Sequence, residues 1–198
     1  DSLKKTFSMD AWNNKFHTFH EKEGRFCNSC SRIISENITQ GGFIYSDGRH
    51  ICKLCHISII EDEKSIISSY LSVHNQLKEI GFLDIPHDIP IILINLFELN
   101  KKYATTMHGD LKGITTIKSN NDSEYLYEIF ILFGLPKIEF EAVLAHELLH
   151  VWLNENNLVL GGDFLEGFCN LGTALIYEND NTHFSQIHLK AMQNNSDI

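Results

Sequence analysis

Apolar residues recur every three or four positions in several long stretches of the chain, a spacing that predicts amphipathic helices. The first stretch runs to Ile80, and Gly81 follows it as a suitable helix end. In the second, Pro136 suits the first helical position and apolar residues then continue through Leu153. The predicted helices cover residues 58–80, 136–153, 164–177 and 183–192.

Between the first two helices, short runs rich in β-branched and aromatic residues predict strands. Pro86 and Pro90 break the chain ahead of these runs. The predicted strands are residues 91–94, 111–118 and 125–133, with one or two helical turns at residues 95–102. Residues 1–22 are expected to form a short helix or an irregular arm. This mixture of helices and a few strands predicts an α+β fold.

Two Cys-x-x-Cys pairs mark a compact module at residues 23–57. Its cysteines are Cys27, Cys30, Cys52 and Cys55. Asp47-Gly48, between two short β-rich runs, predicts a type I′ hairpin ahead of the second pair. Four thiolates complete a tetrahedral zinc site, so we expect a zinc ribbon or half of a LIM domain, with His50 and His56 as bystanders. So small a module buries little apolar surface, and zinc should supply much of its folding free energy.

Composition and charge narrow the functional classes. A hydrophobic content of 43% with 21% charged residues is ordinary for a globular protein. The formal net charge of −10 argues against a nucleic-acid partner, which normally requires a basic face. No apolar run is long enough to span a membrane and no signal region is evident, so we expect no membrane contact and a cytoplasmic location. Cysteines in metal-ligand spacing agree with that compartment.

The chemistry centres on the stretch Ala145–Leu153, which contains His-Glu-x-x-His. On a helix, His146 and His150 lie on one face, one turn apart, where both can bind the same Zn²⁺. Glu147 then lies beside the metal and can take a proton from zinc-bound water. A surface helix with two salt-bridged histidines is the alternative. Apolar residues flank the motif, however, and buried imidazoles and carboxylates are costly unless paired or metal-bound.

Glu166 is our choice for the third zinc ligand. It lies in the first turn of the next predicted helix, and an antiparallel arrangement would bring that turn back towards the histidines. Asp163-x-x-Glu166 also fits a helix capping box, and Asp163 could itself reach the metal. Asn170, one turn further on, could orient the ligand. Cys169 is interpreted as a small buried residue.

These motifs resemble those of the plant DA/DAR group of ubiquitin-activated LIM metallopeptidases and their bacterial relatives. The matching stretches are Asp47-Gly48-Arg49 leading into Cys52-x-x-Cys55, then residues 131–136, residues 144–153 and Glu166-Gly167-Phe168-Cys169. Their order and spacing agree over roughly residues 12–195. The Phe-Gly-Leu-Pro segment ahead of the predicted zinc helix is more specific than His-Glu-x-x-His.

The resemblance implies a gluzincin-like, or mini-zincin, peptidase domain with a LIM-like module packed against it. It implies the expected roles for His146, Glu147 and His150, with Glu166 in the Glu-Gly stretch. The ubiquitin-interacting motifs of the plant members are not found in this sequence, so ubiquitin is a partner by resemblance only. His17 and His20 stand where the family has half of an additional zinc site, so zinc there should be weak. Both ends of the chain look trimmed.

The sequence therefore predicts a zinc-dependent endopeptidase that cleaves protein or peptide substrates. Its expected parts are an N-terminal arm (1–22), a LIM-like ribbon with a structural zinc (23–57) and a peptidase domain with a catalytic zinc (58–198). Tyr177, His183 and His188 are candidates, by residue type, for stabilising the transition state. The alternatives are an interaction module with a dormant site, which intact Glu147 disfavours, or an intracellular peptidase that cleaves a repressor.

Overall fold

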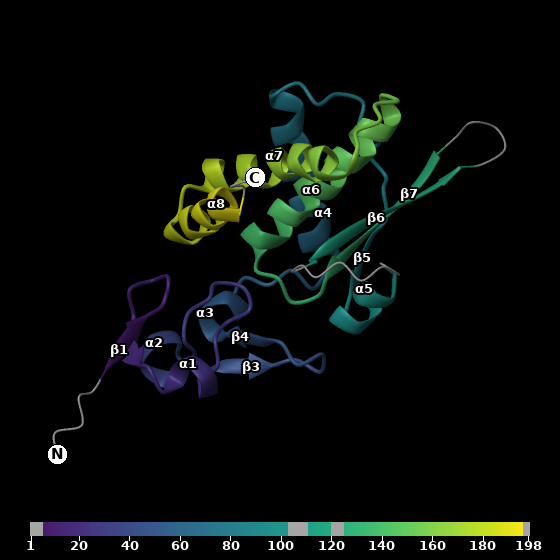
Figure 1. Ribbon diagram of the computed structural model, residues 1–198. Coiled ribbons are helices and arrows are strands. Elements are labelled where there is room, and N and C mark those ends of the chain that lie inside the picture. Colours follow the sequence, from purple (N-terminus) through teal and green to yellow (C-terminus); the bar gives the residue numbers. More distant parts are fainter. Residues whose placement is uncertain (1–5, 103–110, 120–124, 196–198) are drawn as a thin grey trace, which may run out of the picture. The chain divides into compact units, whose positions relative to one another are not determined.

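The computed structural model describes residues 6–102, 111–119 and 125–195 (Figure 1). The chain divides into two compact units. The N-terminal unit comprises Asp1–Ile59 together with Gly134–Pro136, and the C-terminal unit comprises Ile60–Phe133 and Lys137–Ile198. The division into an arm, a ribbon and a peptidase domain at residues 22 and 57 stays a prediction.

The N-terminal unit begins with a hairpin, so the expectation of a helix or irregular arm over residues 1–22 is wrong. Strands β1 (Phe7–Met9) and β2 (Lys15–His17) pair antiparallel, and only the single-turn helix α1 (His20–Glu23) follows. The Asp10 carboxylate forms the turn by accepting hydrogen bonds from two backbone N–H groups, those of Trp12 and Asn14 (both 2.9 Å). Trp12 donates its indole N–H to the carbonyl of Cys30 (2.6 Å). Trp12 therefore packs on the loop that carries Cys30 rather than on a helix face.

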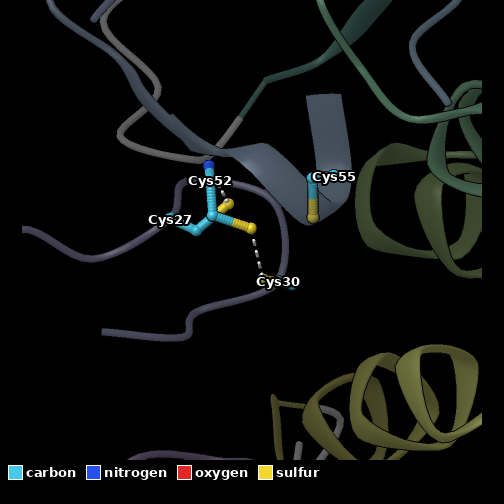
Figure 2. A group of neighbouring side chains, drawn as sticks. All are labelled: Cys27, Cys30, Cys52 and Cys55. Atoms are coloured by element: carbon cyan, nitrogen blue, oxygen red, sulfur yellow. Dashed lines mark hydrogen bonds between the residues drawn. The ribbon is translucent and has the colours of Figure 1, made fainter. Parts of the chain in front are cut away.

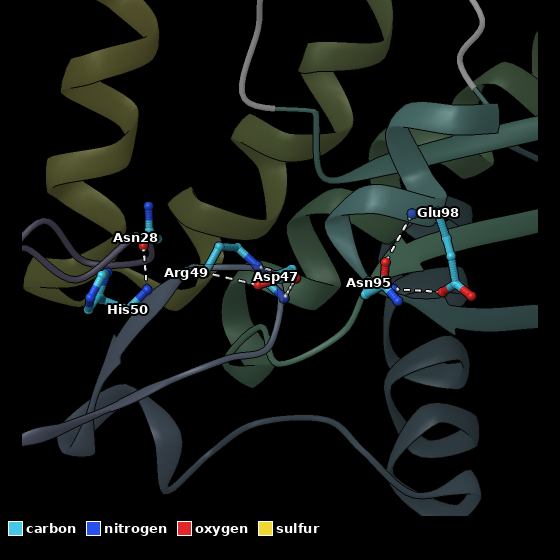
Figure 3. Close-up of polar contacts among 6 residues, drawn as sticks. All are labelled: Asn28, Asp47, Arg49, His50, Asn95 and Glu98. Carbon is cyan, nitrogen blue, oxygen red and sulfur yellow. Dashed lines mark hydrogen bonds and ion pairs between the residues drawn. The ribbon is translucent and has the colours of Figure 1, made fainter.

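The remainder of the N-terminal unit is built on a second hairpin, of β3 (Gly42–Ile44) and β4 (His50–Cys52), which confirms the predicted strand pair. The predicted type I′ turn is wrong, because only Gly48 has a positive φ (87°). The Asp47 carboxylate instead accepts hydrogen bonds from the backbone N–H and the guanidinium of Arg49 (Figure 3). Short helices α2 (Glu36–Thr39) and α3 (Lys53–His56) lie on either side of the hairpin in the sequence.

Gly134–Pro136, part of the Phe-Gly-Leu-Pro segment, belongs to this same unit. Gly134 has a φ of +80°, and a Cβ there would lie 2.1 Å from the ring of Tyr45. Both the backbone conformation and the space therefore require glycine. Pro136 forms an isolated antiparallel bridge with Ile59.

The C-terminal unit contains one mixed three-stranded sheet in the order β5-β7-β6. Its strands are β5 (Ile91–Ile94), β6 (Gly113–Ser119) and β7 (Tyr125–Leu132), as the sequence predicted. β5 pairs parallel with the second half of β7, whereas β6 pairs antiparallel along its whole length. The side chains of β7 alternate between the two faces of the sheet. On one face Tyr127 contacts α6 (Lys137–Glu155), and on the other Phe130 contacts Lys102 of α5 (Leu96–Lys102).

The structure confirms the four predicted helices but corrects the start of the first. Helix α4 (Glu63–Glu79) begins five residues later than the predicted residue 58, because Asp62 and Ser65 form a capping box there and Ile59 pairs in a β-bridge with Pro136. At the start of α5, Asn95 and Glu98 form the same reciprocal pair of hydrogen bonds (Figure 3). The last two helices are α7 (Gly162–Asp180) and α8 (His183–Asn195).

Helix α6 is the centre of this unit, and it lies beside α7 (Figure 1). Its side chains Phe140, Leu144 and Leu148 are fully buried. Gly172 allows α7 to approach closely, since a Cβ at this position would lie 2.8 Å from the carbonyl oxygen of Ala145. This close contact places the first turns of α7 beside the His-Glu-x-x-His stretch. Among the described residues, no helix is long and apolar enough to cross a bilayer.

Candidate metal sites

The four cysteines of the N-terminal unit come together as predicted (Figure 2). Cys27 and Cys30 lie in one loop, Cys52 ends β4, and Cys55 lies in α3. All are buried, and their sulfur atoms lie within 4.8 Å of one another. Strand pairing and the turn into α3 thus bring the two Cys-x-x-Cys pairs together.

The geometry of this cluster fits zinc. Sulfurs bound tetrahedrally at about 2.3 Å lie about 3.8 Å apart, and Cys30 Sγ and Cys52 Sγ are 3.7 Å apart. The backbone N–H of Cys52 donates to Cys27 Sγ (3.3 Å), which favours a thiolate there. Hydrogen bonds from the neighbouring thiols hold the pKa of Cys27 far below its usual range. A divalent cation would replace the thiol protons and hold the four sulfurs together.

The other histidines of this unit lie outside the cluster. His56 stacks on Phe43, with ring centroids 3.9 Å apart. His50 contacts Asn28 through its backbone: its N–H donates to Asn28 Oδ1 (2.6 Å) and its carbonyl accepts from the Asn28 backbone N–H (2.8 Å). His17 and His20 lie near one another, with ring centroids 6.2 Å apart. Neither belongs to a group of three or more potential metal ligands among the described residues. A weak zinc at His17 and His20 stays a prediction.

In the C-terminal unit, α6 and α7 bring together the predicted ligands of the second site. The Nε2 atoms of His146 and His150 are 3.2 Å apart. Glu166 reaches across from α7, with Oε2 3.2 Å from His146 Nε2 and Oε1 3.9 Å from His150 Nε2. The capping-box alternative is wrong, because the N-cap of α7 is Gly161 and no side chain caps the helix.

Two of these three separations also match zinc, and the third, between Glu166 Oε1 and His150 Nε2, is wider at 3.9 Å. Two ligand atoms bound tetrahedrally at about 2.0–2.1 Å lie about 3.3 Å apart. Two unprotonated imidazole nitrogens would repel at 3.2 Å, so their approach calls for a shared proton or a cation. Contact with His146 lowers the pKa of Glu166, so this carboxylate stays ionised. Burial lowers the pKa of His150 to about 4, which keeps its imidazole neutral and able to bind metal.

Two further residues of α7 face the histidines. Asn170 Oδ1 lies 3.1 Å from His146 Nδ1, so the amide oxygen can accept from that nitrogen and leave Nε2 for the metal. Cys169 is fully buried, and its sulfur lies within 4.8 Å of ligand atoms of both histidines. Burial raises the pKa of this thiol to about 12. The sequence indicated burial of Cys169 but not its proximity to the histidines.

Glu147 has partners on β6 that sequence reasoning missed. Thr115 donates its hydroxyl proton to Glu147 Oε2 (2.7 Å). A Cβ at Gly113 would lie 2.6 Å from Glu147 Oε1, so glycine at this position makes room for the carboxylate. Burial raises the pKa of Glu147 to about 7, although the nearby His146 opposes the shift. The carboxyl group is therefore suited to exchange a proton near neutral pH.

Two cavities open onto this cluster, with volumes of about 350 and 330 Å³. Both are lined by His146, Glu147 and Glu166. Of the residues proposed for transition-state stabilisation, Tyr177 and His188 line the second cavity, whereas His183 lines neither. His188 Nδ1 lies 3.0 Å from the carbonyl oxygen of Phe184, which fixes its ring.

The fold and these sites define an α+β protein with a buried four-cysteine cluster and a second possible metal site on a His-Glu-x-x-His helix. The chain belongs to the DA1-like family, described as Protein DA1, which matches residues 99–197. That match extends from α5 through α8 and includes the second site.

Curated relatives extend the similarity into the N-terminal unit. Protein DA1-related 1 of Arabidopsis thaliana is 25% identical over 194 residues, covering 81% of this chain and 34% of its own length. Protein DA1 of the same plant is 24% identical, covering 81% and 36%. The LIM domain-containing protein HDR3 of Oryza sativa subsp. japonica is 24% identical, covering 85% and 40%. The chain thus spans well under half the length of these relatives. No solved structure matches the chain.

Proposed function

We propose that the chain is a zinc-dependent endopeptidase whose active site lies between α6 and α7. The observation that carries the proposal is the arrangement around Glu147. Glu147 is 5% exposed and lines two open cavities. The preceding residue, His146, has its imidazole beside the imidazole of His150 and the carboxylate of Glu166. A purely structural metal site does not require a carboxylate of raised pKa between its histidines. The three ligands would be His146, His150 and Glu166.

A zinc ion held there by His146, His150 and Glu166 would supply Lewis-acid polarisation of a carbonyl and of a water molecule. Thr115 holds one oxygen of Glu147, so the other would accept a proton from the attacking water. The buried carboxyl group would then hold this proton and deliver it to the leaving amine. Asn170 fixes the ring orientation of His146. Tyr177 and His188 line the second cavity, and of the two the Tyr177 hydroxyl is the better candidate to donate to the developing oxyanion, because His188 already uses Nδ1 on the carbonyl of Phe184.

Strand β6 provides a place for an extended substrate. It is an edge strand of the sheet, and among the described residues it pairs only with β7. Its residues Gly113 and Thr115 line the first cavity beside Glu147. A peptide added along this edge would lie across the cluster with its backbone hydrogen-bonded to β6. We infer that the substrate binds in extended conformation.

The four-cysteine cluster would hold a second, structural zinc in the N-terminal unit, as in a LIM-like module. The support is the convergence of four buried thiols and the LIM domain in the name of one relative. In this proposal the chain binds two zinc ions, and metal analysis of carefully purified protein should find two equivalents.

The proposal is tested by comparing wild type with Glu147→Gln, which keeps the side-chain shape but removes the base. Zinc content should stay at two equivalents, while cleavage of a peptide library falls by at least about 10²-fold, as expected for loss of a general base. Glu166→Ala should instead lose one zinc together with activity. Equal cleavage by wild type and Glu147→Gln would refute the proposed mechanism.

A further inference from the structure

The two cavities that meet at the proposed zinc site differ in chemistry. The first, here called the apolar cavity, has a wall of aliphatic side chains. These are Ile117, Leu153, Leu158, Val159, Leu160 and Leu165. The second, here called the polar cavity, is also partly apolar, with Leu111, Ala142, Val143, Ala191 and Met192 in its lining. It differs from the first in the charged and hydrogen-bonding groups that it adds. These are Lys112, Glu139, Asn170, Thr173, Tyr177 and His188.

The apolar cavity continues into an exposed apolar surface. Leu158 is 48% exposed and Val159 is 95% exposed, in the loop that joins α6 to α7. Ile117 on β6 is 43% exposed. Isolated apolar side chains are common on surfaces, but here several lie around one cavity that also contains His146 and Glu147. Their exposure beside a candidate active site points to a ligand that covers them.

The polar cavity is suited to a different side chain. The Glu139 carboxylate is buried and accepts a hydrogen bond from Lys112 Nζ (2.7 Å), which remains 25% exposed. Thr173 donates its hydroxyl to the carbonyl of Ala142 (3.2 Å). A large aliphatic side chain in this cavity would bury these polar groups further and could offer them no hydrogen bond, whereas a polar side chain could.

Strand β6 gives the two cavities an order along a bound peptide. Lys112, just before β6, lines only the polar cavity, whereas Thr115 and Ile117 line only the apolar one. Antiparallel addition to the strand edge is the slightly more stable arrangement. The peptide would then enter over Ile117 and leave over Lys112. Its residues N-terminal to the cut bond would face the apolar cavity and those C-terminal to it the polar cavity.

We propose that this site selects extended protein segments with a bulky apolar residue on the N-terminal side of the cleaved bond and a polar residue on its C-terminal side. The inference rests on the proposed peptidase function and adds the substrate class. The apolar surface formed by Leu158, Val159 and Leu160 is the specificity-determining element. Val159 is the clearest test position because its side chain is almost wholly exposed in the absence of ligand.

The first experiment reads cleavage sites. The full chain, loaded with zinc, is incubated with a proteome-derived peptide library, and new termini are identified by mass spectrometry. Bulky apolar residues should be enriched about tenfold on the N-terminal side of the cut, within the range that apolar pockets achieve. Val159→Asp should remove most of this enrichment. The matched control is Leu83→Asp, which places the same charge at a residue that is 51% exposed and lines neither cavity.

The second experiment measures binding and does not depend on turnover. Two fluorescently labelled uncharged peptides of identical composition are titrated against zinc-loaded Glu147→Gln. One has leucines in its N-terminal half and serines and glutamines in its C-terminal half, and the other has the reverse order. The first should bind at least about fivefold more tightly, and Val159→Asp in the same background should abolish the difference.

The outcomes separate the inference from the proposed function. Cleavage without the apolar preference, or equal binding of both peptides, overturns the inference and leaves the peptidase intact. Ordered binding with no cleavage by wild type overturns the peptidase and leaves a peptide-binding site of the stated preference. Enrichment on the C-terminal side, with the reversed peptide binding more tightly, shows parallel binding and refutes the assigned order.

Discussion

The close contact of α6 and α7 makes a prediction that two glycines of one helix can test. Gly172 packs on α6, where an added Cβ would lie 2.8 Å from the carbonyl oxygen of Ala145 and 3.1 Å from Leu149 Cδ1. The first of these neighbours is backbone, so the helices must separate by several tenths of an ångström to admit Gly172→Ala. At Gly167, on the same helix, an added Cβ meets no atom within 4 Å beyond its own helix.

The two substitutions should therefore change the free energy of unfolding in opposite directions. Alanine inside a helix is favoured over glycine by roughly 0.8–1.0 kcal/mol, which is the expected gain for Gly167→Ala. Gly172→Ala has the same gain, but forcing a side chain into a well-packed contact costs typically about 1–3 kcal/mol. The difference is a net loss of up to about 2 kcal/mol there. Because the separation of the helices also moves Glu166 away from the histidines, the zinc proposed for this site should bind at least about tenfold more weakly.

The assay is urea unfolding followed by tryptophan fluorescence. The chain has two tryptophans, one in each unit, so a Trp12→Phe background leaves Trp152 of α6 as the reporter. Zinc affinity of the second site is measured by competition with a chelator, and the four-cysteine site should be unchanged. A Gly172→Ala protein as stable as wild type, with unaltered zinc affinity, would refute the claim that this contact sets the position of Glu166.

Other predictions concern single residues. In protein free of metal at His146 and His150, the free energy of unfolding of Glu147→Gln should exceed that of wild type by up to about 3 kcal/mol at pH 8. The difference should vanish below about pH 4.5. Because folding raises the pKa of Glu147, the protonated carboxyl favours the folded state, and this contribution is lost as pH rises through about 7. Parallel pH profiles of stability for the two proteins would contradict this prediction. Thr115→Val should lower turnover about tenfold or more without changing peptide affinity, and Thr115→Ser should restore turnover. Loss of affinity at constant turnover would contradict a positioning role for Thr115. Cys27→Ser should unfold the N-terminal unit, seen in the fluorescence of Trp12, and leave the Trp152 transition in place; an unchanged Trp12 signal would show that zinc does not stabilise this unit.

Much of the fold was predictable because its determinants are local. The helix periodicity gave α4, α6, α7 and α8, and the β-branched runs gave the strands of the sheet. The N-terminal hairpin was missed because its turn depends on one carboxylate, that of Asp10, and because Trp12 packs on a loop distant in sequence. Similarly, the Asp47-Gly48 pair has the composition of a type I′ turn, but the bonds between Asp47 and Arg49 favour a different one.

The candidate site likewise contains residues that the sequence could predict and residues that it could not. His146, Glu147 and His150 are related by helical spacing, so the sequence alone could place them on one face. Thr115 and Gly113 approach Glu147 only through the pairing of β6 with β7 and the packing of the sheet on α6, and nothing in their local sequence marks them. A short, glycine-containing edge strand beside a predicted catalytic helix was the one available signal, since an interior glycine in a strand often marks a close approach.

The same face of α7 packs on α6 and carries the side chains that approach the histidines. Glu166, Cys169 and Asn170 recur at three- and four-residue spacing and so share the helix face that meets α6; Gly172, one turn beyond Cys169, fixes how near that face comes. The side chain of Glu166 is short, so its carboxylate can reach two imidazoles on another helix only if the two helices are close. The residue that determines the proposed zinc geometry most directly is therefore a glycine that has no ligand atom. This also explains why helical spacing alone could propose Glu166 as a ligand but could not exclude its use as a cap: the choice is made by the distance between two helices.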